Sequence, residues 1–427
     1  MHPNDRIVDI VNGKLCSNTT NVEKSVELGN DAMTDFEQKL PTGFYNTIKK
    51  NITVMQPQSN DNTGTSFDVN AIYSRVIVLL SSGRSVDLKD IFSYELSTLP
   101  TSMFQSEGMR ICKAKAALRK SLEVVVSPVY SDNVSIVIDG SALLWTTHWP
   151  TDGLVSDFVN NFKRRVGDYL LKGDVYVIFD RYFDYSTKNV TRKSRQEDME
   201  TKFHLQKNTK LPAQKNILSS INNKKQIIKI ICDELIEERL FAFDVTGHRL
   251  IVTGEDPCPI EVYRNEMKYR HDLISHHEEA DIILTQQALH CAANKNQIVV
   301  VSDDTDVFVL LLHHYDVNCL NITMTMESPS TSKNKTVTDI QLTVEKNKNI
   351  IKNILPAHAI SGCDTVATYF GIGKGKVIKV LREGCELTQI GQMDASIDDV
   401  VLQATRFISS CYGIKDTENM TETRIKV

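Results

Sequence analysis

The sequence lacks a hydrophobic run long enough to cross a membrane. Its most apolar stretch, Val307 to Leu312, is far shorter than the ~18 residues that a membrane helix needs. The first residues, Met1 to Arg6, are polar and lack the apolar segment of a secretory signal peptide. We therefore expect an intracellular protein without membrane spans, in the nucleus or the cytoplasm.

The cysteine pattern and the net charge exclude two further classes of protein. The nine cysteines are odd in number and include no Cys-x-x-Cys pair, which indicates reduced thiols rather than a disulfide or zinc framework. The 49 basic and 54 acidic residues give a formal charge of −5, which excludes a chain-wide basic coat. Any contact with nucleic acid must therefore come from a local patch.

The chain of 427 residues is long enough for one large or two medium domains. Residues 1–70 are rich in Asn, Ser, Thr and Asp, and we expect them to be largely flexible. Residues 71–130 form an N-terminal appendage of unknown role, with an amphipathic helix near 108–123. We place a core domain at 131–345 and a C-terminal helical region at 346–427.

Strands and helices alternate from about residue 133. Short β-branched runs predict strands at 134–139, 174–180, 248–254, 297–302 and 321–326, with an apolar continuation at 307–315. Apolar periodicity predicts helices at 152–171, 216–243, 278–295 and within 350–412. This alternation predicts an α/β fold with three layers, in which helices cover both faces of a mostly parallel central sheet.

Acidic residues follow several of the predicted strands or open the helices beside them. Each single acid has a simple explanation, because Asp is a favourable helix N-cap and Glu is favourable in a first helical turn. The carboxyl ends of parallel strands meet at one edge of a sheet, however, so the acids should gather there. The candidate site residues are Asp139, Asp180, Glu279, Asp281, Asp304, Asp306 and Asp364.

Such a cluster needs positive charge. Two carboxylates ~4 Å apart repel by about 4 kcal/mol at an effective dielectric constant of ~20. Oxygen ligands alone favour Mg²⁺ or Mn²⁺. Two such ions could activate a water molecule and stabilise the leaving oxygen of a phosphodiester. The sequence therefore predicts a metal-dependent site for phosphodiester chemistry.

A basic segment follows the second predicted strand. Between residues 181 and 225, eleven Lys and Arg stand against four Asp and Glu, within a chain that is acidic overall. A solvated polar loop would explain this composition, and so would a surface for phosphates. The candidate nucleic-acid contacts in this segment are Arg181, Lys188, Arg192, Lys193 and Arg195.

These motifs occur in an order that resembles a known family. The chain reads Ile138-Asp139-Gly140, Phe179-Asp180, Glu279-Ala280-Asp281, Asp304-Thr305-Asp306 and Gly362-Cys363-Asp364, followed by the glycine-rich segment 371–376. This order resembles the flap-endonuclease-like branch of the PIN-domain nucleases over about residues 133–382. No single motif is specific, but five in the same order are more so.

The resemblance implies a PIN-like core, followed by a helix–turn–helix, that hydrolyses DNA or RNA with two Mg²⁺ ions. It assigns Asp139, Asp180, Glu279 and Asp281 to one ion, and Asp304, Asp306 and Asp364 to the other. It implies that the basic insert 181–247 forms an arch over the site. We expect a nucleic acid as the partner, DNA in preference to RNA. The glycine-rich loop would bind duplex phosphates, sometimes with K⁺, through Gly371, Gly373, Lys374, Gly375 and Lys376.

Other readings compete with an active nuclease. A haloacid-dehalogenase-like phosphatase needs a second Asp two residues after Asp139, and that position is Ser141. The open alternative is a catalytically silent nuclease-like scaffold that binds nucleic acid or protein, because fold alone does not confer activity. In either case we expect a monomer without a sliding-clamp peptide.

Overall fold

The computed structural model describes residues 30, 31, 34, 115–131, 133–182, 201–237, 247–264, 266–295, 297–331, 336–364, 366–415 and 417–427. The chain divides into two compact units, and the first is made of Met1–Thr63 and Asp68–Ala71. In its three described residues, the Thr34 hydroxyl donates to the Asn30 carbonyl at 2.9 Å. Apart from these three residues, the expectations for 1–70 and all those for 71–114 therefore concern residues outside the described ranges.

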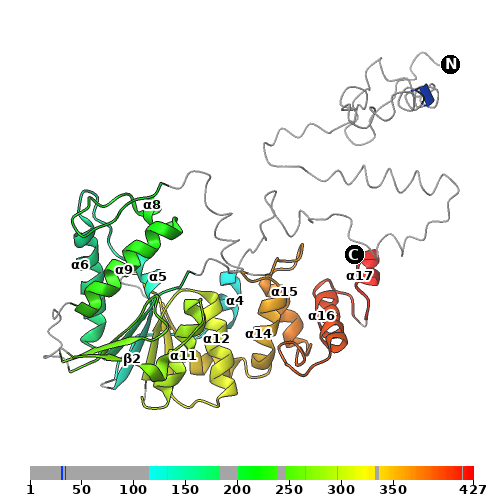
Figure 1. Cartoon of the computed structure of the whole chain (residues 1–427). Helices are drawn as coiled ribbons and strands as arrows, with labels where there is room; N and C mark the ends of the chain where they lie inside the picture. The colour runs from blue at the N-terminus through cyan, green and yellow to red at the C-terminus, as the bar shows by residue number, and fades with distance from the viewer. Residues whose placement is uncertain are drawn as a thin grey trace. The chain divides into compact units, whose positions relative to one another are not determined.

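The second unit is built on a nine-stranded sheet with the order β1-β9-β8-β7-β2-β3-β4-β5-β6 (Figure 1). Its five central strands, β8, β7, β2, β3 and β4, run parallel, and the outer strands are antiparallel. The predicted parallel sheet is thus confirmed for the centre only. The strands are β1 (Val125–Val126), β2 (Val134–Asp139), β3 (Asp174–Ile178), β4 (Leu250–Thr253), β5 (Ile260–Tyr263), β6 (Glu266–Tyr269), β7 (Gln297–Val301), β8 (Thr323–Glu327) and β9 (Val337–Asp339).

Helices cover both faces of the sheet, as predicted. On one face lie α5 (Gly140–Thr146), α6 (Val155–Leu170), α8 (Gln214–Leu218) and α9 (Ile221–Glu237). On the other side lie α11 (Ala280–Ala292), α12 (Thr305–Val317) and α13 (Ile340–Lys346). The same hydrophobic core continues outward into α4 (Lys115–Leu122), α14 (Ile351–Ile360), α15 (Lys374–Arg382) and α16 (Ile397–Cys411), which pack on these helices and on one another. A 3₁₀ turn at His271–Leu273 and α17 (Met420–Lys426) complete the described elements. Among the described residues, no helix is long and apolar enough to span a membrane.

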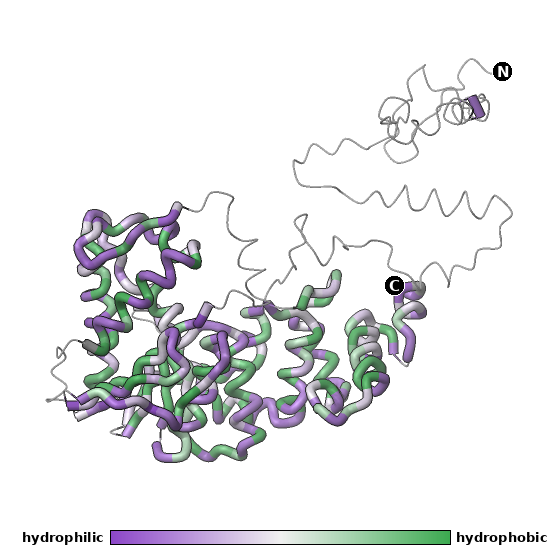
Figure 2. Tube along the Cα trace, in the orientation of Figure 1, coloured by the Kyte–Doolittle hydropathy of each residue, from purple (hydrophilic) through white to green (hydrophobic). Residues whose placement is uncertain are grey.

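Two hydrophobic cores follow from alternation along the strands. In β2, Ile136 and Ile138 face the core under α6 and α9, whereas Val137 faces the core under α11 and α12. Both faces of the strand are therefore buried, which explains its unbroken apolar sequence. On the outer helices, hydrophobic and hydrophilic residues alternate along the tube in Figure 2, as expected of helices that bury one face.

The apolar run at 307–315 does not extend the preceding strand but forms the buried helix α12. Asp304 caps this helix, since its side chain accepts from the Asp306 amide, and the cap starts a helix directly after β7. Because α12 is buried on most sides, its sequence lacks the polar positions that distinguish a surface helix from a strand. The hairpin of β5 and β6 was not predicted, because each strand has only four residues and β6 is exposed along its whole length.

The domain boundaries differ from those predicted. Strand β1 pairs with β9 at the sheet edge, and Leu118 and Leu122 of α4 are buried in the core under α12. Residues 115–130 therefore belong to the core rather than to an appendage. The helices α14, α15 and α16 share that same core, so the boundary at 345 and 346 does not separate two hydrophobic cores.

Candidate active site

The structure brings two groups of predicted acids together at the carboxyl edge of the parallel strands. Asp139 ends β2, and Asp180 lies two residues beyond the end of the neighbouring strand β3. We call these two residues the first carboxylate pair. Asp304, Asp306 and Asp364 form the second carboxylate group, which gathers at the start of α12 and after the end of α14.

Local backbone chemistry fixes the first pair. Asp139 caps α5, with one carboxylate oxygen accepting from the Ala142 amide at 2.9 Å. The amide of Ala280, at the N-terminus of α11, donates to Asp180 at 3.1 Å, and Ser141 donates to the other oxygen at 3.4 Å. Asp139 thus has the capping role expected of a single Asp. The hydrogen bonds from the helix N-termini also hold both carboxylates at one edge of the sheet.

Burial makes Asp139 an unusual carboxylate. Its side chain is buried, and burial raises its pKa to about 6; the nearby charge of Asp180 adds to the rise, while hydrogen bonds from Ala142 and Ser302 oppose it. A positive charge placed at this pair would relieve both the desolvation and the repulsion.

Lysine 224 of α9 supplies part of that positive charge. Its ammonium lies 4.0 Å from an Asp180 oxygen, and its side chain is 14 % exposed. Burial lowers the pKa of Lys224, but Tyr182 and the carboxylates of Asp180 and Asp139 raise it by more, so the net shift of the pKa is upward. Beyond the basic character of the insert, no sequence pattern indicated this role for Lys224.

The second carboxylate group surrounds a lysine from α4. The ammonium of Lys115 donates to Asp306 at 2.9 Å and forms a second ion pair with Asp364. His358 of α14 contacts the other oxygen of Asp306 through Nε2 at 2.7 Å. Burial alone would raise the pKa of Asp306, but His358 and Lys115 hold it well below its usual range. Burial raises the pKa of Asp304.

A serine joins the two groups. The Ser302 hydroxyl donates to Asp139 at 3.2 Å and accepts from the Asp304 amide, also at 3.2 Å. Ser302 directly follows β7 and is fully buried. Sequence reasoning missed it, although it directly precedes the acidic motif 303–306.

The remaining two predicted acids lie at the entrance of α11. Glu279 is the N-cap residue of that helix, and Asp281 lies in its first turn. The Ala280 amide between them bonds Asp180, so the backbone of this motif is tied to the first pair. Both side chains are partly exposed.

The structure places two predicted nucleic-acid contacts in the interior. Arg181 is 1 % exposed, and its guanidinium donates to backbone carbonyls that include those of Gly254, His277 and Asp256, at 3.0 to 3.1 Å. The Lys374 ammonium is also buried, and it donates to the carbonyls of His358 and Gly362. Both cations brace loops, so neither presents its charge to a phosphate as predicted.

The other predicted contacts divide between the exposed loop and residues outside the described ranges. Gly371, Gly373, Gly375 and Lys376 are exposed around the N-terminus of α15. Lys188, Arg192, Lys193 and Arg195 lie outside the described residues, as do 238–246 of the basic insert. Within the insert, 201–237 carries α8 and α9.

Comparisons with known proteins leave the site to be interpreted from its chemistry. No family model matches the chain, and no curated protein matches it. In the described part of the chain, no three His, Cys, Asp or Glu side chains are grouped closely enough to hold a metal ion as they stand. The carboxylates are instead balanced by Lys115 and Lys224.

Proposed function

We propose that this protein is a divalent-metal-dependent nuclease with a PIN-like, flap-endonuclease-like core, which hydrolyses phosphodiester bonds of nucleic acid at the carboxyl edge of its sheet. One observation carries the proposal: the buried Asp139 lies beside Asp180 at this edge, and Ser302 hydrogen-bonds both Asp139 and the backbone amide of Asp304, the first residue of the second carboxylate group. Acids that served only as helix caps would not need to converge in this way.

The first pair offers a donor set that fits Mg²⁺ or Mn²⁺. Asp139 and Asp180 present only oxygen atoms, and their mutual repulsion favours a divalent cation between them. When bound, such an ion would make a water molecule more acidic and stabilise charge on a phosphoryl oxygen. Glu279 and Asp281 flank Ala280, whose amide bonds Asp180, and we propose that they assist this ion through water.

The second group fits an ion only after Lys115 moves. The ammonium of Lys115 already neutralises Asp306 and Asp364, and His358 holds Asp306 from the other side. We therefore propose one resident divalent ion at the first pair, with a second ion and Lys115 as competitors for the second group.

The protein's own cations would position the substrate. Lys224 and Lys115 lie at the carboxylates, where they can attract a phosphate that the acids alone would repel. At the N-terminus of α15, which belongs to the same hydrophobic core as α11 and α12, the exposed residues Gly373 and Gly375 suit a backbone phosphate, and Lys376 adds charge. This loop is our proposed contact to duplex DNA, with K⁺ as an optional companion.

Lys115 also favours a second candidate function. A lysine that fills the position of a metal ion would suit a silent nuclease-like scaffold, which binds nucleic acid or protein without cleaving it. The two candidates share the fold and differ in metal-dependent turnover.

Cleavage assays with matched variants separate the two functions. Labelled single-stranded, duplex and 5′-flap DNA, with the matching RNA, would be incubated with Mg²⁺, Mn²⁺ or EDTA. We expect metal-dependent cleavage that Asp139→Asn and Asp304→Asn reduce at least ~100-fold.

Asp303→Asn is the matched control. Asp303 is adjacent to Asp304 in sequence, but its side chain is 56 % exposed and accepts from Ser328 instead of joining the cluster. The Asp303→Asn variant should therefore cleave the same substrates at the same rate as the wild type. Absence of cleavage on every substrate, with nucleic-acid binding retained, would establish the scaffold instead.

A further inference from the structure

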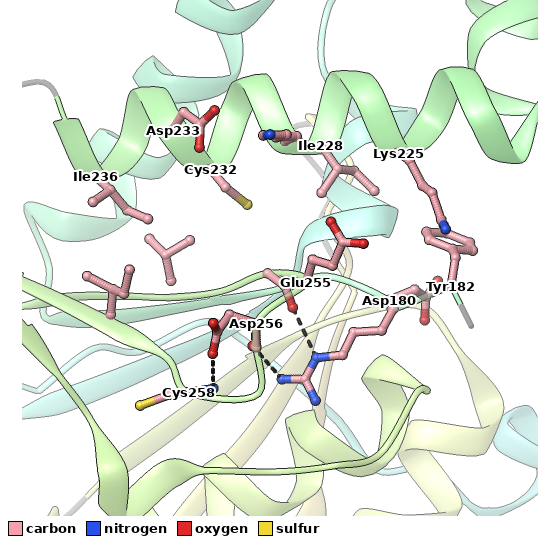
Figure 3. Close-up of a pocket in the computed structure, with 15 residues that line it drawn as sticks. Asp180, Tyr182, Lys225, Ile228, Cys232, Asp233, Ile236, Glu255, Asp256 and Cys258 are labelled. Atoms are coloured by element: carbon pink, nitrogen blue, oxygen red, sulfur yellow. Dashed lines mark hydrogen bonds between the residues drawn. The ribbon is translucent and has the colours of Figure 1, made fainter. Parts of the chain in front are cut away.

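A cavity of about 220 Å³ opens between α9 and the segment that runs from the end of β4 to the start of β5. Figure 3 shows Ile228, Cys232 and Ile236 pointing from α9 toward the strands, where Val252 and Ile260 complete an apolar wall. The volume is below the ~300–1,000 Å³ of pockets for drug-sized ligands. The cavity therefore suits a one- or two-ring group rather than a larger molecule.

The cavity lies directly beside the first carboxylate pair. Asp180, a member of that pair, lines it together with Tyr182. In Figure 3 the Lys225 side chain extends from α9 toward the Tyr182 ring, next to Asp180. Lys224, the preceding residue of α9, lies 4.0 Å from Asp180. If a phosphate is bound at Asp180 and Lys224, the base of the same nucleotide can therefore reach the cavity.

The lining combines the features that recognise an unstacked base. The apolar side of the lining can accept a ring, and the aromatic ring of Tyr182 offers a surface for stacking. Lys225 and Lys229 place positive charge on the α9 side, and carboxylates of Asp233, Glu255 and Asp256 can accept from exocyclic amino groups. Because the lining is continuous with the carboxylate site, its occupant should belong to the same substrate.

We propose that this cavity receives the base of the nucleotide next to the scissile phosphate, turned out of its stack. The inference rests on the proposed nuclease function, since it places the phosphate at Asp180. It adds the contact that would receive an unpaired base at the cleavage site, which is the lining of this cavity. An intact duplex would first have to pay the cost of unstacking one base.

The test compares strands that differ by one missing base. The full chain would be titrated, in Ca²⁺ to slow hydrolysis, with a fluorescent single-stranded DNA and with strands carrying a tetrahydrofuran abasic residue at each position in turn. We expect one abasic position to weaken binding about tenfold, the loss of one stacked base. The same position should mark the cleavage site when Mg²⁺ is restored.

Variants of the cavity provide the second comparison. Ile236→Trp fills the cavity. This variant should therefore bind the intact and the abasic strand with the same affinity, namely the weaker affinity that the wild type has for the abasic strand. Asn222→Trp adds the same side chain at an exposed position of α9 outside the lining, and it should discriminate as the wild type does. If Ile236→Trp fails to fold by circular dichroism, Tyr182→Ala should lose the discrimination and Tyr182→Phe should keep it.

The outcomes separate this inference from the proposed function. Equal binding of intact and abasic strands at every position, with metal-dependent cleavage retained, would overturn the base pocket and leave the nuclease standing. Neither binding nor cleavage of any strand would overturn the nuclease, and the pocket with it. Discrimination retained by both Ile236→Trp and Tyr182→Ala would place the base elsewhere.

Discussion

At the residue scale, the same acids serve as helix caps and as a charged cluster. Asp139 and Asp304 each cap the helix that follows their strand, which is the role expected of any single Asp at such a position. The caps also fix where the carboxylates point, because a side chain bonded to a helix N-terminus has little rotational freedom left. A helix cap and a functional carboxylate are therefore compatible roles here.

The buried carboxylate of Asp139 costs stability at neutral pH. Its pKa rises from 3.8 to about 6 on folding, so between these values the folded state binds more protons than the unfolded state. The free energy of unfolding should therefore fall as pH rises through this window and stay low above it. In EDTA at about pH 7.5, Asp139→Asn should raise the free energy of unfolding by roughly 1–3 kcal/mol.

Urea unfolding from about pH 4 to pH 8 measures this effect. The Asn variant should show a flatter pH dependence below pH 6 than the wild type, while losing metal-dependent activity. Asp152→Asn, at a side chain that is 84 % exposed, is the control and should leave the curve unchanged. A variant less stable than the wild type at neutral pH would mean that the carboxylate is needed for folding.

Arg181 should prove structural rather than substrate-binding. Arg181→Lys removes the planar guanidinium and leaves several carbonyls of the loops at 254–257 and 275–277 without donors, so we expect a loss of about 2–4 kcal/mol of stability. Urea midpoints would measure it, with the exposed Arg164→Lys as control. Unchanged stability with weakened nucleic-acid binding would restore the original prediction.

At the element scale, helix termini supply the geometry that strands alone could not. Strand ends bring Asp139 and Asp180 to one edge, but the N-terminus of α11 bonds Asp180 and the capped start of α12 places Asp306 beside His358 of α14. The site therefore depends on two properties. Where each helix begins is set by nearby residues, whereas the packing of one helix beside another is set by distant segments of the chain.

Two glycines of the segment 371–376 should respond oppositely to substitution by alanine. Gly371 has φ +69°, which disfavours a side chain, so Gly371→Ala should lose about 1 kcal/mol of stability. Gly375 lies inside α15 with open space around its Cα, so Gly375→Ala should gain up to ~1 kcal/mol. Thermal unfolding of both variants checks the sign of each change, and equal signs would contradict this account.

Helix α4 should control the metal stoichiometry. Lys115→Met removes the ammonium from Asp306 and Asp364, so a second divalent ion should bind there at least about tenfold more tightly than in the wild type. Calorimetric titration with Mn²⁺ measures this, and the exposed Lys120→Met on the same helix is the control. The same single binding event in all three proteins would argue against competition between Lys115 and metal.

At the scale of the whole molecule, residues 115–126 are part of the core and of the site. Leu118 and Leu122 are buried, β1 extends the sheet, and Lys115 reaches the second carboxylate group. The contacts are long-range in sequence, so a deletion that treats residues up to 126 as dispensable should expose the core under α12.

Leucine 118 provides the quantitative test. Leu118→Ala should lower the free energy of unfolding by about 2–5 kcal/mol, as expected for a leucine truncated in a packed core. Lys120→Ala, at an exposed position of α4, should change it by less than ~0.5 kcal/mol. If both variants are as stable as the wild type in urea, α4 is an appendage after all.

The sequence by itself determined the parallel centre of the sheet, its strand positions and the edge where the acids collect. These are local or periodic properties: β-branched runs bury both faces, and an acid after a strand caps the next helix. The tertiary structure alone decided that Lys115 and Lys224 balance the acids, that Arg181 and Lys374 turn inward, and that a cavity lies beside Asp180. A charged side chain can face water, a carboxylate or a carbonyl, and only packing between distant segments selects among them.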